Sequence, residues 1–89
     1  SDLCFATTNR QSALLALVDR CDSVIVIGST NSSNTIALVK LAGQANGSEV
    51  IWINRADELP EGLSGTVGVT AGASAPEETV EDVLNALNP

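Results

Sequence analysis

Residues 28–34 form a run of small polar side chains directly after a strongly hydrophobic segment. Val24-Ile25-Val26-Ile27 leads into Gly-Ser-Thr-Asn-Ser-Ser-Asn, and a helix is expected to follow. A helix N-terminus presents unpaired backbone N–H groups and the positive end of its dipole, to which Ser and Asn add neutral donors. Ordinary helix capping explains one such residue rather than six in a row. The run therefore favours an anion-binding loop. It is neither a Walker A loop nor a dinucleotide fingerprint, because Gly-Lys-Ser/Thr and the later glycines are missing.

A second segment, residues 70–76, repeats this design. It reads Thr-Ala-Gly-Ala-Ser-Ala-Pro, so a strand end, small residues and the Ser74 hydroxyl precede another helix start. Taken alone, it is equally compatible with a capped turn. Because ligands of parallel sheets bind outside the carboxyl ends of the strands, two such loops at one edge strengthen each other.

Cys4 is a candidate metal ligand or nucleophile. A thiolate close to the start of a helix is well suited to both tasks. By itself Cys4 is better explained as a small buried thiol, which is also the interpretation of Cys21, between a helix and a strand. The spacing from Cys4 to Arg10 matches the Cys-x5-Arg pattern of cysteine phosphatases. However, Gln11 stands where those enzymes place Ser or Thr, and the loop contains no glycine.

Strand-like and helix-like segments alternate along the chain. Hydrophobic runs typical of strands covered on both faces occupy residues 24–27, 50–53 and 66–70, and a short edge strand is expected at 3–6. Helical patterns cover about 10–20 and 34–45 and begin again at Pro76, while the connection 54–65 has room for one helical turn. This alternation predicts a three-layer α/β domain in which a parallel sheet of three or four strands carries helices on both faces.

Composition limits the possible functions. The net charge is −7 with only four basic residues among 89, so nucleic acid is an unlikely partner. No apolar run is long enough to cross a membrane, and no signal peptide is recognisable. Histidine is absent and the two cysteines make no disulfide framework. We expect residues 1–89 to be a single cytoplasmic domain taken from a longer chain.

Three motifs together resemble the LytB family of 4-hydroxy-3-methylbut-2-enyl diphosphate reductases, in their C-terminal third. They are Cys-Phe-Ala-Thr-Thr-Asn-Arg-Gln at residues 4–11, Val-Ile-Gly-Ser with Asn-Ser-Ser-Asn at 26–34, and Gly-Val-Thr-Ala-Gly-Ala-Ser-Ala-Pro at 68–76. They occur in the family's order, and the resemblance covers essentially the whole chain.

The resemblance implies a specific activity and a specific site. LytB enzymes reductively remove a hydroxyl from an allylic diphosphate, giving isopentenyl and dimethylallyl diphosphate in the methylerythritol phosphate route to isoprenoids. By this resemblance Cys4 is one of three cysteine ligands of a [4Fe–4S] cluster, and Ser32, Ser33, Asn34 and Ser74 bind the substrate diphosphate. Ferredoxin or flavodoxin is the implied electron donor.

The family's catalytic glutamate, its diphosphate-binding histidines and its other two cysteines belong to two further lobes. The resemblance therefore implies that this chain is the third lobe, that the other two lobes are its partners, and that alone it holds no cluster and no activity. Two alternatives remain open. A freestanding phosphate- or phosphosugar-binding module would use the Ser/Asn loop without Cys4, and a cysteine phosphatase would use Cys4 and Arg10.

Overall fold

The computed structural model describes residues 2–5, 11–44, 49–63, 65–73 and 75–87, with backbone alone at 2–5 and 11–13. Strands and helices alternate along it. Their order is β1 (Asp2–Phe5), α1 (Gln11–Arg20), β2 (Ser23–Ile27), α2 (Ser33–Gln44), β3 (Glu49–Ile53), the 3-10 turn η1 (Ala56–Glu58), β4 (Thr66–Ala71) and α3 (Glu77–Leu87). Within those ranges, no helix is long and apolar enough to cross a membrane.

The strands form one parallel sheet in the order β1-β4-β2-β3. The last strand along the chain therefore lies inside the sheet, between β1 and β2. The backbone of Asp22 sets the register at the amino edge, because its N–H donates to the Thr66 carbonyl and its carbonyl accepts from the Glu49 N–H. The predicted fold class, a three-layer α/β domain with a parallel sheet, is confirmed, and the short strand near Cys4 is at the edge as expected.

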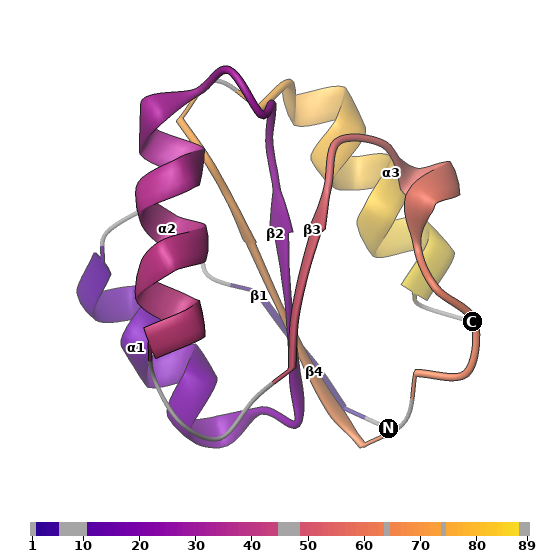
Figure 1. Ribbon diagram of the computed structural model, residues 1–89. Coiled ribbons are helices and arrows are strands. Elements are labelled where there is room, and N and C mark those ends of the chain that lie inside the picture. Colours follow the sequence, from indigo (N-terminus) through magenta and orange to yellow (C-terminus); the bar gives the residue numbers. More distant parts are fainter. Residues whose placement is uncertain (1, 6–10, 45–48, 64, 74, 88–89) are drawn as a thin grey trace.

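Helices cover both faces of the sheet, as Figure 1 shows, with α1 and α2 on one face and α3 with η1 on the other. Alternate residues of the central strands point to opposite faces, so β2 contributes Val24 and Val26 to the core under α1 and α2. It contributes Ile25 and Ile27 to the core under α3. All five residues of β2 are buried, which explains its uninterrupted hydrophobic run.

The strand β3 differs from the expectation that it would be covered on both faces. Only Ile53 at its end is fully buried, and Trp52 is 37% exposed. The reason is its position, because β3 forms an edge of the sheet and has a neighbour on one side only. A hydrophobic run in the sequence shows that a strand is apolar but does not show whether it is central.

Candidate anion-binding site

The sheet has a switch point between the carboxyl ends of β2 and β4. These strands are neighbours, but β2 continues into α2 on one face and β4 into α3 on the other. The two connections meet at one edge of the sheet, at the top of Figure 1. Such crevices are the usual ligand-binding places of parallel α/β sheets, because the two chains leave in opposite directions and open a gap.

A hollow of about 500 Å³ lies at this crevice. Residues of the first loop (residues 28–34) and of the second loop (residues 70–76) line it together. The lining residues are Ser29, Asn31, Ser32, Ser33, Asn34 and Ala73. None of these side chains is charged. The hollow can therefore offer hydroxyl, amide and backbone donors to an anion, but it cannot neutralise the anion's charge.

Ser32 caps the helix α2. Its Oγ accepts a hydrogen bond from the Thr35 N–H at 3.3 Å, and its carbonyl accepts from the Ile36 N–H at 3.0 Å. The Ser32 hydroxyl can still donate, because accepting from an N–H leaves its proton available. Ser33, the first helical residue, is exposed beside it. Capping thus accounts for Ser32, whereas Ser33 is not the residue that caps the start of α2.

Asn34 connects the two loops. Its Oδ1 accepts a hydrogen bond of 2.6 Å from the backbone N–H of Ala73, which lies 39 positions later in the sequence. The side-chain amide nitrogen of Asn34 is a donor on the same group. The sequence pattern predicts Asn34 as a ligand of an anion, but the hydrogen bond by which Asn34 joins the two loops has no signal in that pattern.

The backbone of the first loop is anchored to the sheet at Gly28. The Gly28 N–H donates to the Ile53 carbonyl at 2.9 Å, and its carbonyl accepts from the Trp52 indole Nε1–H at 3.0 Å. In the second loop the Gly72 N–H donates to the Ile27 carbonyl at 2.8 Å. The glycine that follows β2 and the glycine that follows β4 are therefore each held by a hydrogen bond to the neighbouring strand. The hydrogen bond from the Trp52 indole was not predicted from its hydrophobic run.

Cys4 and Cys21 lie in different surroundings. The Cα of Cys4 is level with that of Gly68 in β4. Gly68 precedes Gly72, the first residue after β4, by four positions. At roughly 3.3 Å per residue, the Cα of Cys4 therefore lies at a level about 13 Å before this loop, measured along the strands. Cys21 is 5% exposed and belongs to the core under α1 and α2. The structure thus places Cys21 in packing, as expected.

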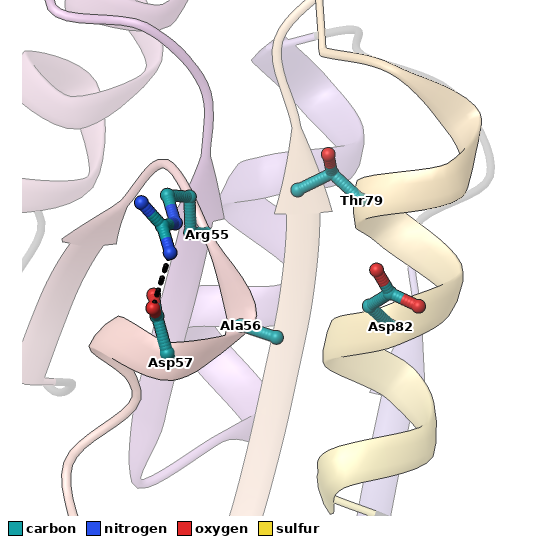
Figure 2. Close-up of a pocket in the computed structure, with 5 residues that line it drawn as sticks. All are labelled: Arg55, Ala56, Asp57, Thr79 and Asp82. Atoms are coloured by element: carbon teal, nitrogen blue, oxygen red, sulfur yellow. Dashed lines mark hydrogen bonds and ion pairs between the residues drawn. The ribbon is translucent and has the colours of Figure 1, made fainter.

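A smaller hollow of about 240 Å³ lies between η1 and α3. Figure 2 shows Arg55 and Asp57 facing each other, joined by an ion pair of 2.6 Å, with Thr79 and Asp82 on the neighbouring helix. The guanidinium of Arg55 is already paired with a carboxylate, and Asp82 adds a second negative charge. This hollow is therefore a poor site for an anion.

A family model for the LytB protein family matches residues 1–88. The chain belongs to the LytB family. This confirms the family resemblance found in the three sequence motifs.

Individual LytB relatives match along nearly the whole chain. It is 54% identical over 89 residues to 4-hydroxy-3-methylbut-2-enyl diphosphate reductase 2 of Mycobacterium bovis, covering 97% of this chain and 27% of that protein. The corresponding reductase of Corynebacterium efficiens is 46% identical over 89 residues, covering 97% of this chain and 26% of its own. This chain therefore spans about a quarter of the length of these relatives.

Two solved structures are similar as well. The E-1-hydroxy-2-methyl-but-2-enyl-4-diphosphate reductase from Plasmodium falciparum superposes with a TM-score of 0.82 at 34% identity, over 97% of this chain and 28% of that one. An (E)-4-hydroxy-3-methyl-but-2-enyl diphosphate reductase superposes with a TM-score of 0.79 at 33% identity, over 88% of this chain and 28% of that one.

The structure brings together part of the LytB site predicted from sequence. Ser32, Ser33 and Asn34 line one hollow with Ala73 of the second loop. Ser74, the next residue along, lies outside the described residues, and so does Arg10, on which the phosphatase alternative depended. Among the described residues no cluster of His, Cys, Asp or Glu side chains could hold a metal ion.

Proposed function

We propose that this chain is the C-terminal lobe of a 4-hydroxy-3-methylbut-2-enyl diphosphate reductase, and that its share of the work is to hold the substrate diphosphate and to supply one cluster ligand. The observation that carries the proposal is the hollow lined by Ser32, Ser33, Asn34 and Ala73 at the switch point, in a chain of the LytB family. The neutral lining fits a diphosphate enclosed by further lobes, where each donor acts at low dielectric.

The reaction is a reductive dehydroxylation. The allylic C–O bond of the substrate breaks, two electrons and two protons enter, and water leaves, so that isopentenyl and dimethylallyl diphosphate are formed. The electrons come from a carrier protein, for which a ferredoxin or flavodoxin is suited. Ser32, Ser33, Asn34 and Ser74 bind the diphosphate and so orient the allylic end, while the other lobes exclude water.

The residues present fit a shared [4Fe–4S] cluster and not one held by this chain alone. Such clusters are ligated by cysteine thiolates, and three protein cysteines leave one iron open to an exchangeable ligand. This chain offers Cys4 on a strand that runs toward the same edge of the sheet as the two loops. Cys21 is buried behind β4 in the core, so it is no substitute. When bound, the cluster would pass on the electrons from the carrier and supply a Lewis-acidic iron.

Removing one hydroxyl from the hollow tests the diphosphate role. In the full-length enzyme, Ser33→Ala should weaken the binding of inorganic diphosphate by roughly ten- to a hundred-fold, because a hydrogen bond to a charged group contributes about 1.5–3 kcal/mol. Isothermal titration calorimetry measures the affinity, and visible absorbance shows whether the cluster is intact.

The matched control removes a hydroxyl from the hollow beside Arg55 instead. Thr79→Ala should leave diphosphate affinity unchanged, because Thr79 lies beside the Arg55–Asp57 ion pair on the other face of the sheet. Equal diphosphate affinities of Ser33→Ala and the unmodified enzyme would contradict the proposal. Tight binding of diphosphate by the isolated 89-residue chain, without iron, would instead favour the freestanding binding module.

A further inference from the structure

Thr35 is the most deeply buried polar residue near the two loops. Its side chain is fully buried, and its Oγ1 has no hydrogen-bond partner among the described residues. It stands in the first turn of α2, directly after Ser33 and Asn34, but it does not line the hollow. A buried hydroxyl without a partner is costly, so its position calls for a physical reason.

The Thr35 side chain fills the space that a Cβ atom would occupy at two glycines. A Cβ built on Gly28 would overlap Thr35 Oγ1 and stand 2.7 Å from its Cγ2. A Cβ built on Gly72 would overlap the same Oγ1 and stand 3.2 Å from the Thr35 Cβ. The hydrogen atoms that these glycines carry in place of a side chain therefore point at the Thr35 oxygen, in the geometry of weak Cα–H···O contacts.

These glycines are required for space and not for backbone conformation. Positive φ angles among the described glycines occur at Gly62 and Gly65, whereas Gly28 and Gly72 have none. Gly28 begins the first loop, directly after β2, and Gly72 begins the second, directly after β4. One side chain thus separates the first turn of α2 from the starts of both loops.

We propose that Thr35 is a positioning residue whose bulk sets the distance between the two loops, and thereby fits their span to a diphosphate rather than to a single phosphate. The inference rests on the proposed diphosphate site. The Asn34 Oδ1–Ala73 N–H bond joins the loops one residue away, so a shift at Thr35 moves the donors of the first loop relative to those of the second. The volume of the Thr35 side chain carries this role, because its Oγ1 faces both glycines and its methyl group faces Gly28, while the side chain does not line the hollow.

Two substitutions separate volume from the hydroxyl in the full-length reductase. Thr35→Val keeps the shape and removes the oxygen, whereas Thr35→Ala removes both. The affinities of inorganic diphosphate and of orthophosphate are measured by calorimetry, with visible absorbance to confirm an intact cluster. We expect Thr35→Ala to weaken the binding of diphosphate about tenfold or more and that of orthophosphate less than about threefold. The reason is that a diphosphate contacts both loops, whereas a single phosphate contacts one loop and does not depend on the distance between them. Thr35→Val should leave both affinities near those of the unmodified enzyme.

A compensating variant guards against simple unfolding. In Thr35→Ala/Gly72→Ala the new Cβ at position 72 occupies part of the vacated space, and we expect it to recover part of the diphosphate preference. The spacing role is overturned if Thr35→Val loses as much diphosphate affinity as Thr35→Ala, because the hydroxyl would then be the active group. It is also overturned if Thr35→Ala weakens both anions equally or neither. Failure of the diphosphate site itself would show earlier, as absent binding in the unmodified enzyme.

Discussion

Gly68, in the middle of β4, allows a quantitative test of the packing assigned to Cys21. A Cβ at this position would stand 2.9 Å from the Cys21 Sγ and 3.3 Å from the Leu17 Cδ2, both inside the core. Optimal separations between such atoms are about 3.5–4.0 Å, so the sulfur would have to move by roughly 0.6 Å or more. Overpacking of this kind costs about 1–3 kcal/mol, and the short cysteine side chain places Gly68→Ala in the upper half of that range.

Removing the Cys21 sulfur should abolish the destabilising effect of Gly68→Ala or turn it into a stabilising one. In a Cys21→Ala background the nearest obstacle to a Cβ at position 68 is Leu17, and alanine in a strand is about 0.5–1 kcal/mol more favourable than glycine. Gly68→Ala should then be neutral or slightly stabilising. The coupling free energy between the two substitutions should therefore reach about 2–3 kcal/mol, which is the upper end for residues in contact.

Urea unfolding of the 89-residue chain measures these free energies, with the fluorescence of Trp52, the one tryptophan in the sequence, as the signal. Gly43→Ala is the matched control. A Cβ there has no atom within 4 Å, so the substitution should stabilise α2 by about 0.5–1 kcal/mol. If Gly68→Ala is as stable as the unmodified chain, or if Cys21→Ala does not relieve it, the close packing of Cys21 against β4 is wrong.

Two further outcomes are expected. Trp52→Phe should lower the free energy of unfolding by about 0.5–1.5 kcal/mol, because the Gly28 carbonyl loses the indole N–H, and far-UV circular dichroism during urea unfolding measures the change. An unchanged midpoint would show that water replaces the indole. In the full-length enzyme, Cys4→Ser should lose the visible absorbance of the cluster and turnover together, whereas Cys21→Ala should keep both. The reverse pattern would make Cys21, and not Cys4, the cluster ligand.

Sequence reasoning succeeded where the signal is local. The continuous apolar run at β2 and the small polar residues after it follow each other in the chain, so their order predicts a buried strand that delivers a loop to the sheet edge. The helical turn expected between residues 54 and 65 is η1. The start of α2 at Ser33 lies one position before the expected Asn34, which is the usual scatter of a helix end.

Features that depend on distant contacts could not be read from the sequence. Asn34 has the same composition signal whether it caps a helix, binds an anion or accepts a hydrogen bond from Ala73, and only the folded chain brings Ala73 close. Thr35 falls inside a helical pattern, and its contact with Gly28 and Gly72 requires the strand order. That order, with β4 between β1 and β2, has no local signature, and the edge position of β3 follows from it.

The interior position of β4 has a consequence for the way a ribosome delivers this segment. Among the described strands, β1 is hydrogen-bonded to β4 alone, although the two are separated by most of the chain. While the chain emerges, β2 and β3 can pair early, but β1 lacks the one partner it has among the described strands until Thr66–Ala71 has left the exit tunnel. Non-local parallel pairing is the slow part of folding. The strand β1 and the loop after β4 therefore enter the structure in one late step, so a nascent chain stalled before β4 could pair β2 with β3 but would have neither of these two segments in its final place.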